Sequence, residues 1–358
     1  MEAEVKERVR RFYDSIGWQE IGEGVYQNAR YEDLRPVSRE YIHRCHIRLA
    51  RHLRDQGDFF LDAGSGPIQY PEYLTYSQGF RCRVCLDISR RALLEARKRI
   101  GEHGLYVQGD VAHLPFRKNA FQSVASLHTL HHLPAEQQKR AFCELSRVTE
   151  EGGRCAVVYS WGARSALMRL LRPVVASARA AQRIRQWLRA ARQATWKQRA
   201  PDRGGGRIVL EEVPGSDGRQ ARLLTTPGSY TFHHSAAWMG SHLRQLPELD
   251  VRVWRSLSTE ALRALIHDRL LGRAWLRLLF WMEERAPHFF GRVGQYPLVL
   301  FGGGASWRRT PNAVDGGRRL GADFLSSAHE PCRVRRPGRL GGRVADPVTQ
   351  KAEKNGLG

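Results

Sequence analysis

The sequence of 358 residues predicts an α/β fold built around a mostly parallel β-sheet. The first observation is that short apolar runs alternate with helical patterns between residues 58 and 161, as in successive strand–helix–strand units. The second is that the centres of these runs are fully apolar, which suits strands covered by helices on both faces. Because the connections are short, consecutive strands are expected to lie close together with right-handed crossovers.

The expected elements have recognisable ends. Ser89 can cap a helix that Gly101 follows, and Pro134 can open another that ends before Gly152. A long helix is expected over 260–285. The expected strands cover 58–64, 83–89, 105–110, 123–129 and 155–161, followed by 249–257 and 296–303.

The rest of the chain divides by composition. Residues 1–57 are expected to form an N-terminal helical cap, and residues 58–303 the main domain. An Arg-rich insertion at 163–230 combines a helical pattern with two strand-like runs, at 207–212 and 221–226, and is expected to form a helical and hairpin lid. Residues 304–358 are rich in Gly, Arg and Pro and predict a disordered basic tail.

The net charge of +22 is unusual and is carried mostly by arginine. It predicts attraction to nucleic acid, to an anionic membrane surface or to an acidic substrate, and charge alone does not choose among them. The N-terminus lacks the apolar segment of a signal peptide, and no run approaches the ~18 apolar residues of a membrane span, so a cytoplasmic location is expected. Cys82 and Cys85 form a C-x-x-C inside an apolar run, which favours packed strand cysteines over a metal or redox site.

A glycine-containing turn follows the first strand of the alternating region. In LDAGSGP (61–67), Gly64 and Gly66 allow a tight turn and the close approach of a ligand to the main chain. A dinucleotide fingerprint requires a third glycine three residues later, where this chain has Gln69. Asp62 precedes the glycines and suits a cationic ligand, such as the sulfonium and amino group of S-adenosylmethionine (SAM), better than a pyrophosphate.

Two more carboxylates follow at the ends of the next strands. Asp87 lies about 20 residues after the glycine turn, where a carboxylate can accept both hydroxyls of a ribose. Asp110 ends the third strand and could receive an adenine amino group. An Asp at a strand end is commonly a turn former. Together with Asp62, however, they make three carboxylates at the ends of successive strands. These three are expected to face one crevice, which favours a cofactor site.

The segments LDAGSGP, LDIS, GDVAHLPF and SLHTLHHLP, spread over 61–134, resemble the successive motifs of class I SAM-dependent methyltransferases, most closely the type 11 or quinone-biosynthesis-like subgroup. The resemblance implies a Rossmann-like seven-stranded sheet whose last strand is antiparallel, a place that YPLVLFGG (296–303) is suited to fill. It implies SAM as cofactor and a small organic methyl acceptor. The residues that it assigns to the cofactor are Asp62, Gly64, Gly66, Asp87, Ile88, Asp110, Val111, Leu127 and His128.

The sequence offers candidates for catalysis and acceptor binding, but no motif as specific as that of the cofactor site. His128 or His131 could act as a general base, although methyl transfer can depend mainly on alignment. Histidines 128, 131 and 132 could also suggest a metal, but no carboxylate stands near them before Glu136, so no metal site is expected. The candidate acceptor contacts are Tyr31, Arg35 and His233.

Two other functions remain open. An NAD-type oxidoreductase of related fold is disfavoured by Gln69 and by the setting of Asp110. A non-catalytic module of the same fold could bind RNA or an anionic membrane through the Arg-rich 163–230 segment.

Overall fold

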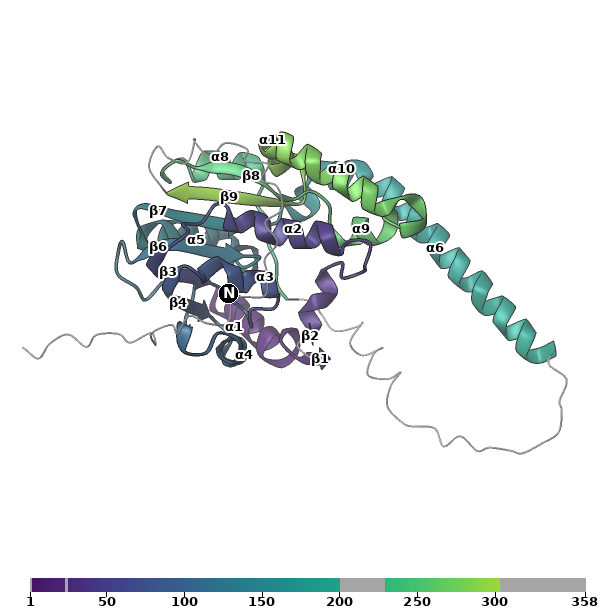
Figure 1. The fold of residues 1–358 in the computed structure, drawn as a ribbon, viewed down its shortest axis with the longest axis horizontal. Coiled ribbons are helices and arrows are strands. Elements are labelled where there is room, and N and C mark those ends of the chain that lie inside the picture. Colours follow the sequence, from purple (N-terminus) through teal and green to yellow (C-terminus); the bar gives the residue numbers. More distant parts are fainter. Residues whose placement is uncertain (1, 23–24, 200–228, 303–358) are drawn as a thin grey trace, which may run out of the picture.

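The computed structural model describes residues 2–22, 25–199 and 229–302 (Figure 1). Their centre is a seven-stranded sheet in the order β5-β4-β3-β6-β7-β9-β8. The strands are β3 (Gly57–Ala63), β4 (Phe80–Asp87), β5 (Gly104–Gln108), β6 (Phe121–Leu127), β7 (Thr149–Val158), β8 (Asp250–Arg255) and β9 (Tyr296–Gly302). The expected strands of the described residues are all present within three positions of their predicted limits, except that β7 begins six residues earlier than predicted.

The pairing confirms the predicted sheet class. Strands β5, β4, β3, β6 and β7 run parallel to their neighbours, whereas β9 lies antiparallel between β7 and β8. The last strand of the described chain is therefore the antiparallel one, as expected for 296–303.

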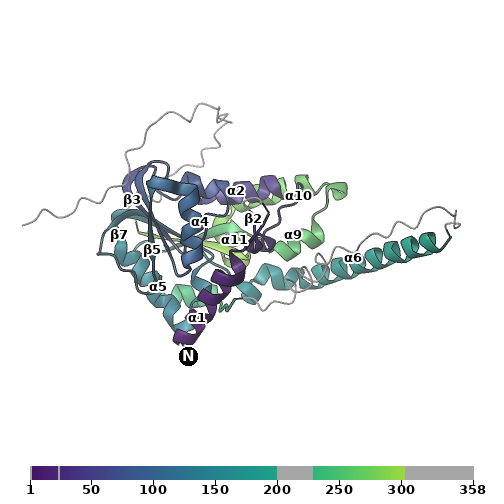
Figure 2. The ribbon, with the colours of Figure 1, turned by 90° about the horizontal axis from the view of Figure 1, so that it is seen from below.

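The described helices cover both faces of the sheet. One core cluster joins α2 and the helices after β8 to Phe60 and Leu298, and a second joins α5 and α8 to Leu61 and Val299. Figure 2 shows α2 and α10 on one side of the sheet and α5 on the other. The helices are α1 (Glu2–Phe12), α2 (Arg39–Ala50), α3 (Pro71–Leu74), α4 (Arg90–Ile100), α5 (Ala135–Val148), α6 (Ala166–Arg199), α8 (Ala236–His242), α9 (Thr259–Leu265), α10 (Gly272–Arg285) and α11 (Pro287–Val293).

Three expectations change or fall outside the structure. The long helix over 260–285 is instead two helices, α9 and α10, because the chain turns between them and Leu271 adopts a left-handed conformation with φ 56°. The N-terminal segment is not purely helical, since β1 (Glu20–Gly22) pairs with β2 (Val25–Tyr26). The predicted hairpin within 207–226 and the tail 304–358 lie outside the described residues.

The α6 helix leaves the body of the domain and extends away from it, in both Figure 1 and Figure 2. No described residue of α6 lines the cavity described below, whereas Ser229, near the end of the expected lid, does. Among the described helices, none combines the length and apolar character needed to cross a membrane.

A buried polar network holds α2 and α10 against the end of β8. Arg48 of α2 donates to Glu283 at 3.0 Å and to the Trp254 carbonyl at 2.7 Å. Glu283 is fully buried and also accepts from the Tyr41 hydroxyl and the Ser256 amide, at 2.7 and 3.0 Å. This network fixes the β8 end, which contributes the next residue, Arg255, to the cavity.

Replacing Arg48 with methionine is expected to destabilise the fold by about 3 kcal/mol or more, because it leaves Glu283 buried without its cationic partner. Arg51→Met is the matched control, since the exposed Arg51–Glu284 pair contributes at most about 1 kcal/mol. Urea unfolding of both variants measures the difference. Equal free energies of unfolding in the two variants would show that the network does not stabilise the domain.

Candidate functional site

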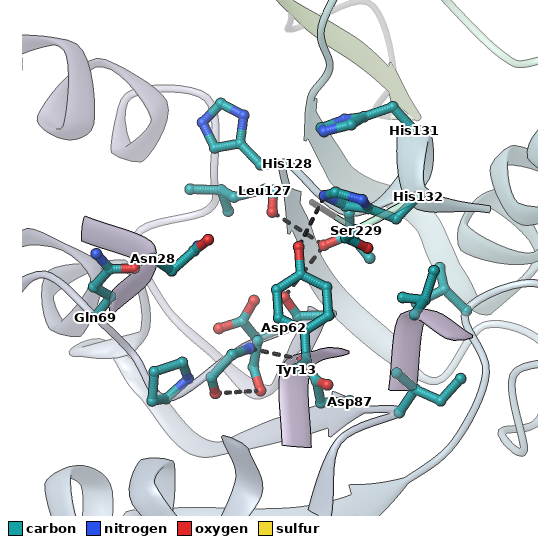
Figure 3. A pocket seen from close by; sticks show the side chains of 18 of the residues that line it. Tyr13, Asn28, Asp62, Gln69, Asp87, Leu127, His128, His131, His132 and Ser229 are labelled. Atoms are coloured by element: carbon teal, nitrogen blue, oxygen red, sulfur yellow. Dashed lines mark hydrogen bonds between the residues drawn. The ribbon is translucent and has the colours of Figure 1, made fainter. Parts of the chain in front are cut away.

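A cavity of about 520 Å³ opens at the carboxyl ends of the parallel strands (Figure 3). It lies where the chain winds from β3 toward β4 on one side and toward β6 on the other, the switch point at which open α/β sheets bind ligands. All the residues predicted to bind the cofactor line it: Asp62, Gly64, Gly66, Asp87, Ile88, Asp110, Val111, Leu127 and His128.

The glycine turn is built as its sequence predicts. Gly64 and Gly66 both have positive φ, at 77° and 56°. The amides of Gly64 and Ser65 donate to the Leu86 carbonyl, which ties the turn to β4. A side chain on Gly64 would lie 2.2 Å from the Thr129 hydroxyl oxygen, so glycine is required for space as well as for conformation.

Asp87 lies at the base of the cavity with no cationic partner among the described residues. Its two carboxylate oxygens accept from the Gly66 amide at 2.9 Å and from the Ser89 amide at 2.8 Å. Burial raises its pKa to about 6, partly offset by these amides, and nearby Asp62 and Asp14 add to the rise. Its negative charge is therefore incompletely compensated.

Asp62 is paired with an arginine that sequence analysis did not single out. Arg83, in the middle of β4, donates to the Asp62 carboxylate and, at 2.7 Å, to the Tyr73 carbonyl. Both side chains are buried and line the cavity, and the Arg83 Nε has no hydrogen-bond partner. The signal in the sequence was an arginine inside an apolar strand, because a buried arginine needs a partner.

The N-terminal segment covers the same half of the cavity. Lys6 of α1 pairs with Asp110, which also accepts from the Ala112 amide at 2.9 Å. Burial opposes ionisation of Asp110, but these contacts lower its pKa. After α1, a π-helical turn η1 (Tyr13–Gly17) is fixed by the Ser89 hydroxyl, which donates to Asp14 at 2.6 Å.

Aromatic residues of this segment enclose the glycine turn. Tyr13 stacks on Trp18, with ring centroids 5.2 Å apart, and its hydroxyl bonds with the His132 ring nitrogen at 2.9 Å. Figure 3 shows the Tyr13 ring between Asp87 and His132. Trp18 lies over Gly66, where an added Cβ would come within 3.1 Å of its ring.

The other half of the cavity is polar and aromatic. The buried Arg255 of β8 pairs with Glu32 and lies 4.6 Å from the centre of the Tyr296 ring. Burial opposes ionisation of Glu32, but Arg255 and His46 outweigh it and hold the pKa of Glu32 at about 2. The other lining residues of this half include Asn28, Tyr31, Gln69, Tyr70, Tyr73, His128, His131, Ser160, Thr231 and His233.

The histidines of the cavity are held neutral. Burial lowers the pKa of His128 to about 3, with a further contribution from Arg255, and lowers the pKa of His131 well below its usual value. The efficiency of a general base falls when its pKa lies far below the working pH. Both histidines line the cavity, but their lowered pKa values do not support the predicted role as general base.

The predicted acceptor residues have different outcomes. Tyr31 lines the cavity, and so does His233, whose Nδ1 bonds with the Ser160 carbonyl at 2.8 Å and whose ring stacks on His131. Arg35 does not line it. Its guanidinium is held by the fully buried Asp33, at 2.7 Å, and by the Leu262 carbonyl, so the expectation that Arg35 contacts the acceptor is corrected.

No group of three or more His, Cys, Asp or Glu residues with the arrangement of a metal site occurs in the described part of the chain. Cys82 and Cys85 are both buried in β4.

Residues 61–157 match the model of a methyltransferase domain, type 11. The match covers the segment that carries most of the motifs quoted above, and the predicted resemblance to methyltransferases is confirmed for this part of the chain. A probable tRNA methyltransferase 9B from Homo sapiens is 26% identical over 137 residues, which are 37% of this chain and 28% of that protein. The tRNA (carboxymethyluridine(34)-5-O)-methyltransferase alkbh8 of Xenopus tropicalis is 26% identical over 140 residues, 35% of this chain and 22% of that one.

The aligned part thus spans less than a third of either relative. Among solved structures, geranyl diphosphate C-methyltransferase from Streptomyces coelicolor A3(2) is 16% identical, with a TM-score of 0.43, and the match covers 84% of this chain and 98% of that one.

Gly64→Ala is expected to reduce stability by about 2 kcal/mol or more, because it combines positive-φ strain with the contact to Thr129. Gly152→Ala is the matched control: its φ is also positive, at 75°, but an added Cβ meets nothing within 4 Å. Thermal unfolding of both variants compares strain alone with strain plus crowding. If Gly64→Ala were no more destabilising than Gly152→Ala, the turn would have room for a side chain.

Proposed function

We propose that this protein is a SAM-dependent methyltransferase that binds its cofactor in the half of the cavity formed by the glycine turn, Asp87 and Asp110. The observation that carries the proposal is the incompletely compensated charge of Asp87 beside a turn that only glycine can form. A cationic ligand relieves the cost of this buried carboxylate, whereas a pyrophosphate would increase it.

The lining residues support this proposal because they offer a suitable partner to each part of SAM. The buried pair of Asp62 and Arg83 offers a carboxylate and a guanidinium to the amino and carboxylate groups of the methionine end. Asp87 can accept the ribose hydroxyls, with Ile88 beside it, and Asp110 and Val111 stand where the adenine is expected. Leu127 and His128 then flank the boundary between the two halves of the cavity.

SAM supplies an electrophilic methyl group on a sulfonium. The protein's part is to exclude water and to hold the acceptor in line, a contribution that can account for much of the rate. Tyr13 and Trp18 close the cofactor half, while the neutral His128 and His131 offer hydrogen bonds to the acceptor without placing a second positive charge beside the sulfonium.

We further propose that the acceptor is a small organic molecule. The acceptor half is walled by the segments that carry Asn28 to Glu32 and Ser229 to His233 and by the ends of β8 and β9. Its two charged groups, Glu32 and Arg255, are buried and paired with each other. A flipped nucleobase of RNA is the alternative, which the names of the two relatives and the net charge of +22 favour. An NAD-type oxidoreductase has less support, because its pyrophosphate would meet Asp87.

SAM affinity is expected to fall as the pH drops through about 6, where Asp87 becomes protonated. The direction of the change follows from the raised pKa of Asp87. Below this pH the carboxyl group is protonated, so a ligand that needs the carboxylate must compete with the proton and binds more weakly. We expect up to about tenfold weaker binding at pH 5 than at pH 7, measured by calorimetry.

In Asp87→Ala the pH dependence is expected to vanish and the affinity to drop by about a hundredfold, because two hydrogen bonds to a charged group are lost. Asp58→Ala is the control, since Asp58 is an exposed carboxylate of β3 outside the cavity. Wild-type affinity in Asp87→Ala would show that the cofactor binds elsewhere. Tight binding of NADH, with none of SAM, would favour the oxidoreductase.

Radiolabelled SAM tests the acceptor. The full-length protein is incubated separately with a small-molecule extract and with total tRNA, and methyl transfer is followed by chromatography. We expect label in an organic-soluble product and none in tRNA. Label that stays in the RNA and is released as a modified nucleoside on nuclease digestion would contradict a small acceptor while leaving SAM-dependent methyl transfer intact.

A further inference from the structure

The α6 helix has an extreme charge composition. Its 34 residues include eight arginines and one lysine and no aspartate or glutamate. At 1.5 Å per residue it is about 51 Å long. Only its first half packs on the domain, and every described residue from 183 to 190 is exposed.

The face that packs on the domain is defined by its contacts. Val175 is buried in the core that includes α9, and Met168 accepts from the Ser258 amide at 3.4 Å through its sulfur. Gln182 donates to the Ala264 carbonyl at 3.3 Å. Positions 168, 175 and 182 recur every seven residues and so lie on one side of the helix.

A second apolar stripe lies elsewhere around the helix. Leu170, Val174, Ala181, Ile184 and Leu188 follow intervals of three, four or seven residues and lie roughly 140° from the packing face. Leu170 is 74% exposed, Val174 52%, Ile184 59% and Leu188 44%. Trp187, beside this stripe, is 68% exposed.

Exposure of large apolar side chains is concentrated at this end of the molecule. Of the fifteen such residues in the described chain, eleven lie either on α6 or between Leu270 and Phe289, including all three exposed tryptophans. The other four are scattered. Since clustered exposed apolar residues mark interaction surfaces, a partner for this end is expected.

The chemistry of the partner follows from charge and apolarity together. A second copy would bring nine positive charges against nine more. A nucleic acid would neutralise the arginines but leave the leucine and isoleucine side chains of the stripe in water. An anionic lipid surface satisfies both, because a basic helix with tryptophan, leucine and isoleucine along one face lies in the plane of the membrane interface.

We propose that α6 docks on an anionic phospholipid surface, with the stripe Leu170–Leu188 and Trp187 at the acyl boundary and the flanking arginines among the headgroups. The helix lies on the surface and does not cross it. The inference does not depend on the proposed methyl transfer, because no α6 residue lines the cavity.

The test is flotation of the full-length protein with phosphatidylcholine vesicles that contain about 30% phosphatidylglycerol, and with pure phosphatidylcholine vesicles. We expect binding to the first and little to the second. The triple variant Ile184→Ala, Trp187→Ala, Leu188→Ala should bind at least about tenfold more weakly. Alanine preserves helix propensity, which circular dichroism verifies, and Leu94→Ala removes an exposed leucine of α4 as the matched control.

A second variant tests the charges. Changing Arg183, Arg185 and Arg189 to glutamine keeps the stripe and should abolish the preference for anionic vesicles. The proposal is overturned if the wild type does not float with anionic vesicles, or if the triple alanine variant floats as the wild type does. Binding of tRNA that depends on the arginines but not on the stripe, without vesicle binding, would identify RNA instead. A dimer that the alanine variant dissociates, again without vesicle binding, would identify a second copy.

Discussion

The site depends on a single feature of the sheet, the reversal of winding direction at β3. From β3 the chain moves to β4 and β5 on one side and then returns to β6 on the other. The helices that follow β4 and β6 therefore lie on opposite faces, and the loops at the carboxyl ends of β3 and β6 diverge. The cavity occupies this divergence, with Asp62 at its centre, Asp87 on one side and His128 on the other.

Most of the carboxylates that line the cavity are paired with a cation. Four carboxylates line it, and three of them have cationic partners: Asp62 with Arg83, Asp110 with Lys6 and Glu32 with Arg255. Such pairs recover only part of the cost of removing charges from water, so they contribute more to a defined arrangement than to stability. They connect the N-terminal segment, strands β3 and β4, the end of β5 and strand β8 around the cavity. Asp87 is the remaining carboxylate, and it lacks a positive partner among the described residues.

The cofactor half of the cavity could be predicted from sequence because each of its residues is local to a strand end. A glycine turn or an aspartate after an apolar run predicts a site at the end of that strand, wherever the strand lies in the sheet. The register of parallel strands then brings these ends together. The exception is Arg83, whose importance depends on burial against Asp62 in the neighbouring strand.

The acceptor half could not be predicted in the same way. Glu32, Arg255 and Tyr296 are far apart in sequence and meet only because β9 inserts antiparallel next to β8 and the N-terminal segment folds over both. Arg35 shows the reverse problem: it has the right residue type near the site, but Asp33 two residues away captures its guanidinium. The break between α9 and α10 could not be predicted either, because no proline lies there. The chain turns at Leu271, which has a left-handed conformation.

These features link the two halves of the cavity through charge. In the acceptor half Arg255 is balanced by Glu32, and the buried histidines stay neutral, so that half adds no net positive charge. In the cofactor half Asp87 provides an incompletely compensated negative charge. A sulfonium between them would be attracted by Asp87 and not repelled by the histidines. A methyl acceptor in the other half would then approach the cation from a side without net positive charge, where a direct displacement would depend mainly on alignment.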